Sequence, residues 1–193
     1  MRICIFGAAS PLIDEEYIKA TEALGETLAK RGHNLVFGGG NNGLMGAAAR
    51  GFKKAGAHII GVIPKFFEQE TVEEICGFCD ELITPDTMRE RKQIIEDHAD
   101  AFIVVPGGIG TYEEFFEILT SKQLCRHRKP IALYNILGYY NELYATMQSA
   151  MDKEFIKENC KLLYLISENV DEIIKYIESP DDLKYSIKEL KNG

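Results

Sequence analysis

Residues 101–124 read AFIVVPGGIGTYEEFFEILTSKQL. Within this stretch, Ala101–Val105 is a short apolar run, which predicts a buried parallel strand. The glycine turn Pro106–Gly110 follows, and Tyr112–Leu124 has the apolar spacing of a helix. A strand that leads through glycines into a helix predicts an anion site, because backbone N–H groups can approach the anion and the positive end of the helix favours its charge. We therefore expect a phosphate group to bind at this turn.

The alternation of apolar runs with helical periodicity continues on both sides of this stretch. The expected strands are Arg2–Phe6, Asn34–Phe37, His58–Ile63, Glu81–Thr84, Ala101–Val105, Ile131–Tyr134 and Leu162–Ile166. The expected helices are Glu15–Arg31, Leu44–Lys54, Asp86–His98, Tyr112–Leu124, Gly138–Met151 and Val170–Ile177. This order predicts an α/β fold with a doubly wound parallel sheet, which binds ligands at the carboxyl ends of its strands.

The length of 193 residues and the even composition predict a single domain over residues 1–178. Ser179-Pro180 breaks the pattern, and residues 179–193 form a polar tail. Leu183, Ile187 and Leu190 have helical spacing in that tail, which is consistent with a short docking helix or with a frayed terminus.

The composition limits the partners. There are 22 basic and 30 acidic residues, a formal charge of -8, which argues against nucleic acid or an anionic membrane as the main partner. No apolar run has membrane-spanning length, and Met1-Arg2 leads directly into a predicted strand, so we expect a cytoplasmic protein without a signal peptide.

Five cysteines, an odd number, fit a reducing compartment. Cys76-Gly77-Phe78-Cys79 has the spacing of a redox or zinc pair. The four histidines supply no second ligand pair of suitable spacing, and a predicted strand rather than a long helix follows Cys79. The sequence therefore favours two unlinked thiols.

Two other glycine-bearing turns follow predicted strands, Gly7–Ser10 and Gly38–Gly43. The second matches G-x-G-x-x-G, but the next strand ends in Ile63-Pro64-Lys65 without the acid that would bind a ribose, so NAD binding is a weak alternative. There is no P-loop motif. Three small turns at neighbouring strand ends suit a compact ligand with a single phosphate, although Gly7–Ser10 alone is equally consistent with a tight turn that binds nothing.

Glu114 stands at the far end of the anion turn, where a negative side chain opposes simple anion binding. Thr111-x-x-Glu114 has capping-box spacing, so Glu114 either caps the helix or takes part in chemistry. Glu113 lies about 100° away around the helix and is not expected to share its site. The helix dipole is expected to lower the pKa of a first-turn carboxyl group, which suits a base or a stabiliser of positive charge.

Met88-Arg89-Glu90-Arg91-Lys92 is a basic cluster in an acidic chain. Its helix is expected to start from a Thr84 cap with Pro85 in the first position. A solvated charged face is the usual interpretation of such a run. Here, however, the strand after this helix leads to the anion turn, so an arginine could bind the phosphate or the leaving base.

With these motifs in place, the chain resembles the Lonely Guy family of cytokinin riboside 5′-monophosphate phosphoribohydrolases, over Arg2 to about Ile177. Pro106–Glu114 fits the family motif P-G-G-x-G-T-x-x-E, and Gly38–Gly46 fits its second glycine block. Gly61–Lys65 and Met88-x-x-Arg91-Lys92 also match. Proteins of this family are often labelled lysine decarboxylases, but no lysine here stands in the context of a pyridoxal site.

The resemblance implies hydrolysis of the N-glycosidic bond of purine nucleoside 5′-monophosphates, releasing free base and ribose 5-phosphate. It implies Arg91 and Glu114 as the catalytic pair, a Rossmann-like sheet and a homodimer, and it calls for no metal or cofactor. The resemblance places the phosphate on Gly107, Gly108, Gly110 and Thr111, and it implies that Thr120 also lines the site. The other substrate-binding residues that we predict, from the remaining turns and matched motifs, are Ser10, Gly39, Gly40, Gly43, Met88 and Lys92. A non-catalytic carrier of molybdenum cofactor or a nucleotide is the alternative, which the complete motif disfavours.

Some positions differ from the family pattern. Arg89 and Ser121 stand where histidine and tryptophan are common, and Glu154-Phe155-Ile156 replaces a Gly-Phe-Ile. A substrate-binding acid is expected before Met88, and the sequence does not choose among Glu68, Glu70 and Glu73. These differences leave the preferred base open, whether prenylated adenine, adenine or another.

Overall fold

The computed structural model describes residues 1–69, 74–179 and 185–191. Its strands are β1 Arg2–Phe6, β2 Asn34–Phe37, β3 Ile59–Val62, β4 Glu81–Ile83, β5 Ala101–Val104, β6 Ile131–Tyr134 and β7 Leu165–Ser167. They form one sheet in the order β4-β3-β2-β1-β5-β6-β7, and every pair of neighbours is parallel. The doubly wound parallel sheet predicted from the sequence is confirmed.

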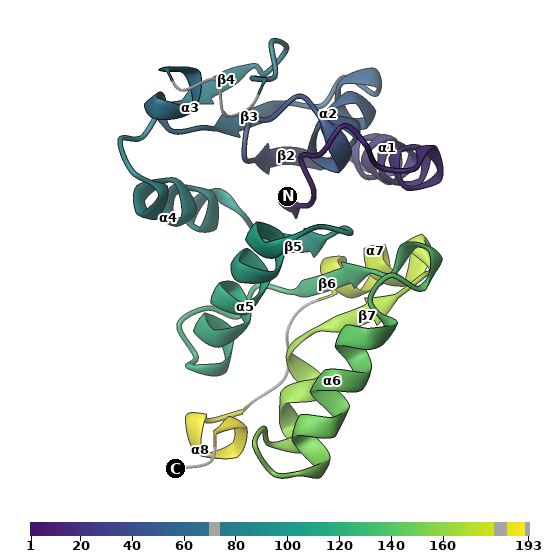
Figure 1. Cartoon of the computed structure of the whole chain (residues 1–193), viewed down its shortest axis with the longest axis vertical. Coiled ribbons are helices and arrows are strands. Elements are labelled where there is room, and N and C mark those ends of the chain that lie inside the picture. Colours follow the sequence, from purple (N-terminus) through teal and green to yellow (C-terminus); the bar gives the residue numbers. More distant parts are fainter. Residues whose placement is uncertain (70–73, 180–184, 192–193) are drawn as a thin grey trace.

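Helices cover both faces of the sheet (Figure 1). They are α1 Glu15–Lys30, α2 Gly43–Lys54, α3 Lys65–Gln69, α4 Met88–His98, α5 Ile109–Gln123, α6 Asn141–Asp152, α7 Val170–Glu178 and α8 Ile187–Leu190, with 3-10 turns at Ile136–Gly138 and Glu158–Leu163. Alternate residues of a strand enter opposite cores: Ile3 and Ile5 of β1 pack with α1, α2 and α7, whereas Cys4 and Phe6 pack with α4, α5 and α6. Burial on both faces explains why the strands are continuous apolar runs.

The sheet order reverses between β1 and β5, because the chain adds β2 to β4 on one side and β6 to β7 on the other. The loops that follow β1 and β5 therefore meet at this point, and the amide of Ala8 donates a hydrogen bond to the Pro106 carbonyl over 3.0 Å. Ligands of open parallel sheets bind where the strand order reverses. The fold thus places the predicted anion turn at the expected position.

Several predicted boundaries are wrong. Helix α4 begins at Met88, not Asp86, because Thr87 rather than Thr84 is its cap. The Thr87 hydroxyl accepts from the Glu90 amide over 3.2 Å, and the Glu90 carboxylate accepts from the Thr87 amide over 3.1 Å. Helix α6 begins only at Asn141, since Leu137 and Gly138 both have positive φ and form a 3-10 turn. The short helix α3 was not predicted, and β7 begins at Leu165, not at residue 162, which lies in the second 3-10 turn.

The C-terminal segment packs against the body of the chain. Leu190 of α8 is fully buried, and its carbonyl accepts hydrogen bonds from the Gln123 amide over 3.0 Å and from the Cys160 thiol over 3.0 Å. Pro180 and Leu183 of the predicted tail lie outside the described residues. Within the described residues, no helix combines the length and apolar character needed to cross a membrane.

Candidate functional site

The N-terminus of α5 forms the anion turn. The helix begins at Ile109 after Gly108, which caps it without a side chain, so Thr111 lies inside the helix and the predicted Thr111–Glu114 capping box is wrong. A Cβ on Gly107 would lie 2.1 Å from the Thr111 hydroxyl, so only glycine lets the turn fold this closely onto the helix. The first N–H groups of a helix have no acceptor within it. Those at the start of α5 are available to a ligand.

Three successive carbonyl groups of the turn are held by other parts of the chain. The Val105 carbonyl accepts from the Tyr140 hydroxyl over 2.8 Å, and the Gly107 carbonyl accepts from the Tyr139 hydroxyl over 2.6 Å. The Pro106 carbonyl between them accepts from the Ala8 amide. In a trans peptide the C=O and N–H groups point in opposite directions. These bonds therefore direct the N–H groups of Gly107 and Gly108 away from Ala8 and Tyr139. No motif in the sequence indicated the two tyrosines.

A cavity of about 340 Å³ opens in front of this helix terminus. Its lining residues come from the loop after β1, from α2, α3 and α4, and from the anion turn and first turns of α5: Gly7, Ala8, Ala9, Ser10, Met45, Phe67, Arg91, Gly108, Gly110, Thr111 and Glu114. Next to it lies a second hollow of about 240 Å³, which shares Ala8, Ser10 and Gly108 and is bounded by Tyr17 and Tyr139. The structure thus brings together six predicted site residues from three separate segments, with room for a ligand larger than a phosphate group.

Arg91 enters the cavity from α4 and is almost fully buried, with 5 % of its surface exposed. Its Nε donates to the Val62 carbonyl over 3.1 Å and its Nη2 to the Gly38 carbonyl over 3.2 Å. The guanidinium also lies over the Phe67 ring, 5.7 Å from its centroid. A Cβ on Gly38 would lie 2.0 Å from Nη2, so glycine at this position makes room for the arginine. Arg91 is thereby fixed in one orientation.

Glu114 faces Arg91 across the cavity, with 3.8 Å between its Oε1 and the arginine Nη1. Only 13 % of its side chain is exposed. Burial raises the pKa of Glu114 to about 7, although the positive charge of Arg91 opposes the shift. The prediction of a lowered pKa is therefore wrong, because desolvation disfavours the carboxylate more than its surroundings favour it. A carboxyl group with this pKa can gain or lose a proton near neutral pH.

Lys92 and Met88 lie on α4 outside the lining of the cavity. The Lys92 ammonium pairs with Glu113 over 2.6 Å and with Glu117 over 2.8 Å, which joins α4 to α5. Met88 has 38 % of its surface exposed. Lys92 thus supports the position of the Arg91 helix, and contact of either residue with substrate stays a prediction.

The glycines of the second glycine block lie beside the cavity and allow the surrounding segments to pack closely. Gly39, Gly40 and Gly43 are buried and do not line the cavity. A Cβ on Gly43 would lie 2.3 Å from the Ala8 carbonyl, so this glycine allows α2 to approach the loop after β1. Direct substrate binding by these glycines stays a prediction. Glu70 and Glu73 lie outside the described residues, and Glu68 lies in α3.

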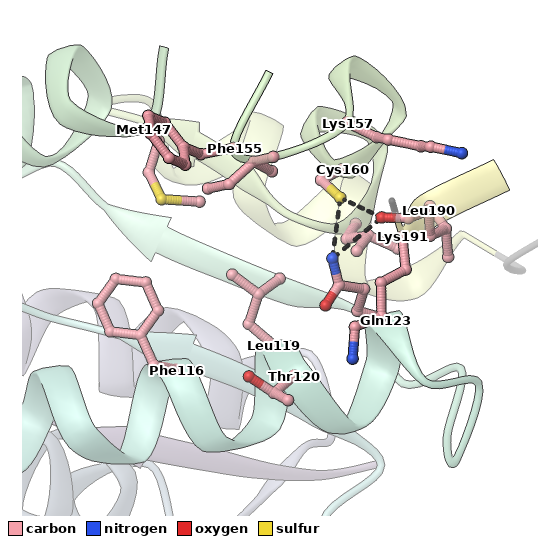
Figure 2. A pocket seen from close by; sticks show the side chains of 12 residues that line it. Phe116, Leu119, Thr120, Gln123, Met147, Phe155, Lys157, Cys160, Leu190 and Lys191 are labelled. Carbon is pink, nitrogen blue, oxygen red and sulfur yellow. Dashed lines mark hydrogen bonds between the residues drawn. The ribbon is translucent and has the colours of Figure 1, made fainter. Parts of the chain in front are cut away.

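Thr120 lies six residues beyond Glu114, which is about 9 Å along α5 and on a different face. It lines a separate cavity of about 270 Å³ with Phe116, Leu119 and Gln123 on one side and Phe155 on the other (Figure 2). A single copy of the chain therefore does not bring Thr120 to Glu114.

Phe67 and Met45 line the cavity but were not among the predicted site residues. Phe67 follows the matched Gly61–Lys65 block by two positions, and Met45 lies inside the second glycine block. Both motifs indicated that these segments lie near the site, but neither indicated which apolar side chain would face the cavity.

A pair of alanine substitutions tests the architecture of the turn. Gly110→Ala is expected to raise the free energy of unfolding by about 0.5–1 kcal/mol, because alanine favours a helix and a Cβ there meets no atom within 4 Å. The same substitution should weaken binding of inorganic phosphate, since Gly110 lines the cavity. Gly107→Ala is expected to destabilise the fold by about 1–3 kcal/mol through overpacking. Urea denaturation and phosphate titration measure both effects, and equal stability changes in the two variants would contradict this geometry.

Sequence comparison identifies related proteins. Residues 45–177 match a family described as "Possible lysine decarboxylase". A cytokinin riboside 5′-monophosphate phosphoribohydrolase of Arabidopsis thaliana is 37 % identical over 179 residues, which cover 92 % of this chain and 77 % of the relative. A probable enzyme of the same name from Oryza sativa subsp. japonica is 34 % identical over 186 residues, which cover 94 % of this chain and 74 % of the relative.

Structure comparison identifies the same architecture in other proteins. A molybdenum cofactor carrier protein from Chlamydomonas reinhardtii has a TM-score of 0.68 and 24 % identity, covering 90 % of this chain and 93 % of its own. A molybdenum cofactor binding protein from Rippkaea orientalis has a TM-score of 0.65 and 23 % identity, covering 92 % and 93 %. At this level of identity the similarity establishes the fold and nothing about the ligand.

Proposed function

Because the chain belongs to the Lonely Guy family of cytokinin riboside 5′-monophosphate phosphoribohydrolases, we propose that it hydrolyses the N-glycosidic bond of purine nucleoside 5′-monophosphates. The products are a free base and ribose 5-phosphate. The observation that carries the proposal is one cavity in which Glu114 and Arg91 face each other beside the N-terminus of α5. A phosphate site next to a buried carboxyl group of raised pKa suits cleavage of a bond close to that phosphate.

In the proposed mechanism the substrate phosphate binds the amides at the start of α5, which positions the ribose beside Glu114. As the glycosidic bond breaks, the bonding electrons leave with the base and positive charge develops on the sugar. The Glu114 carboxylate stabilises that charge and accepts a proton from the water that attacks the anomeric carbon. The proton taken from water passes on to the departing base, which neutralises the base and returns Glu114 to its carboxylate form.

Arg91 contributes a fixed positive charge. Its hydrogen bonds to Gly38 and Val62 leave Nη1 as the guanidinium nitrogen nearest Glu114. This charge keeps part of the Glu114 population ionised despite burial, and it offsets negative charge on the phosphate or the departing base. Because the arginine is already oriented, little reorganisation accompanies the reaction.

The pH dependence of kcat/KM follows from the pKa of Glu114. A general base must be ionised, so kcat/KM is expected to rise with pH and to reach half of its plateau near pH 7. The substrate phosphate titrates near pH 6 and adds a second pH-dependent limb to the profile of kcat/KM. Binding of ribose 5-phosphate over the same pH range isolates that limb, since it involves no bond cleavage. A rate that falls as pH rises through 7 would show instead that Glu114 acts as a proton donor.

A panel of nucleoside 5′-monophosphates, with chromatography of the released bases, tests the activity and identifies the preferred base. Prenylated and unmodified adenine nucleotides belong in the panel. The described lining of the cavity includes no lysine, which does not favour a decarboxylase. If no nucleotide is cleaved and the purified protein carries a pterin, a carrier function would replace the proposed one.

We also propose that the chain acts as a homodimer. Phe116 of α5 is 40 % exposed, Tyr144 of α6 is 57 % exposed and Phe155 is 80 % exposed, and a second copy would cover such aromatic side chains. Thr120 lies beside Phe116, so any substrate contact by Thr120 is expected to need the partner subunit. Sedimentation velocity should show a dimer that Phe116→Ser together with Phe155→Ser converts to a monomer, and a monomeric parent protein would contradict this.

A further inference from the structure

Cys76 and Cys79 occupy the two ends of a tight turn, with Gly77 and Phe78 as its central residues. The outer Cα atoms of a β-turn lie within about 7 Å of each other. Disulfides span Cα separations of about 4.4–6.8 Å. The turn therefore holds the two cysteines at a separation that a disulfide can bridge. The two thiols are free in the structure and in contact with each other.

The surroundings of the Cys76 sulfur favour its thiolate form. It accepts hydrogen bonds from the Cys79 thiol and from the backbone N–H groups of Phe78 and Cys79. These bonds lower the pKa of Cys76 to about 7, with a further contribution from the charge of Arg50. The pKa of Cys79 is raised, since its proton is shared with the neighbouring sulfur. Cys76 is buried and Cys79 is half-buried, so a small reagent reaches the pair from the side of Cys79.

The turn contacts the chain neighbours of both residues whose carbonyl groups hold Arg91. The Cys76 amide donates to the Gly39 carbonyl over 2.8 Å, and Gly39 is the neighbour of Gly38. On the other side, the Cys79 sulfur lies 3.0 Å from the position of a Cβ on Gly61, which is the neighbour of Val62. A change in the position of either sulfur therefore acts on a residue adjacent to an Arg91 acceptor.

The segment before the turn strengthens this connection. Ile75 and Gly40 form an antiparallel bridge, and the Asn41 amide donates to the Glu74 carbonyl over 2.8 Å. The Asn41 side chain also donates to the Glu74 carboxylate over 2.8 Å. Residues 74–76 thus form an added strip along the glycine turn after β2, and movement of the strip is transmitted to that turn.

We propose that Cys76 and Cys79 form a reversible intramolecular disulfide that reduces the activity of the neighbouring site by displacing Arg91. Two S–H bonds break and one S–S bond forms. The two electrons and two protons pass to the disulfide of a small thiol, such as oxidised glutathione, which leaves as two thiol molecules. Existence of the disulfide is independent of the proposed function, whereas its effect on activity rests on it.

Oxidation of the whole chain by glutathione disulfide tests the proposal, with Cys79→Ser as the variant and Cys125→Ser as the matched control, because Cys125 is exposed and outside the site. Peptide mapping should find a Cys76–Cys79 bond in the parent chain and in Cys125→Ser. In both, kcat/KM for the nucleotide should fall roughly tenfold, the cost of weakening a charged hydrogen bond, and dithiothreitol should restore it. Cys79→Ser should keep its activity.

Hydrogen exchange separates the disulfide from the catalytic proposal. Oxidation should speed exchange of the amides in residues 38–41, whether or not any nucleotide is cleaved. A peptide map with only glutathione adducts, or a Cys76–Cys79 bond that leaves this exchange unchanged, would overturn the inference. A chain that forms the bond and shows the exchange but cleaves no nucleotide when reduced would refute the proposed function alone.

Discussion

Glu114→Gln is expected to reduce release of base from nucleoside 5′-monophosphates by about 10²–10⁴-fold, the usual contribution of a general base. Glutamine fills the same space but neither accepts a proton nor balances positive charge on the sugar. The fold should survive, because Glu114 does not cap α5. Chromatography of the released base measures the effect, and ribose 5-phosphate should still bind the turn at Gly108 and Gly110.

The stability of this variant has its own pH signature. The pKa of Glu114 is about 7 in the folded chain, above its ordinary value of 4.5. The folded state therefore binds more protons than the unfolded state between these values, and its stability falls as pH rises through that range. Glu114→Gln removes this pH dependence. In urea denaturation, the free energy of unfolding of the variant, relative to that of the parent protein, should therefore rise from pH 5 to pH 8.

Glu113→Gln is the matched control for Glu114. Glu113 is the adjacent residue of α5, its side chain is 54 % exposed, and it pairs with Lys92 outside the cavity. Its substitution is expected to change kcat/KM by less than about fivefold, because an exposed ion pair contributes less than about 1 kcal/mol. Equal losses of activity in the two variants would contradict a specific role for Glu114.

Local patterns in the sequence were sufficient to predict the sheet and the anion turn. The conformation of Ala101–Val105 and of the glycine turn after it is determined by residues close in the sequence. Apolar periodicity and glycine spacing were therefore enough to predict both. The cap of α4 was also visible, since Thr87 and Glu90 have capping-box spacing, but Thr84-Pro85 offered a competing start. Local sequence alone could not decide which of these two starts the helix uses, because that depends on how the helix packs in the fold.

The properties of Glu114 could not be predicted from its position in α5. Its place at the start of the helix indicated a lowered pKa, but burial by groups from distant segments has the larger effect. Arg91 lies on α4 and Phe67 on α3, and the sequence does not show that they close over this carboxyl group. The same applies to Tyr139, whose bond to Gly107 spans 32 positions.

Arg91→Lys is expected to lower kcat/KM by about 10²-fold or more, although the charge is retained. Hydrogen bonds from charged groups contribute about 1.5–3 kcal/mol each, and lysine cannot satisfy both the Gly38 and Val62 carbonyls while it faces Glu114. The loss of one such bond should also reduce the free energy of unfolding by about 1.5–3 kcal/mol. Steady-state kinetics and urea denaturation measure the two effects. Arg89→Lys is the control, because Arg89 is exposed on the same helix.

Arg91→Met separates the charge of the residue from its geometry. The positive charge lowers the pKa of Glu114 against the effect of burial, so its removal should move the rise in kcat/KM to a pH above 7. Arg91→Lys should leave this midpoint closer to that of the parent protein, since an ammonium group still acts on the carboxylate. If both variants lose activity without any difference in their pH profiles, Arg91 acts on the substrate and not on Glu114. If both retain full activity, the pair across the cavity is not the catalytic pair.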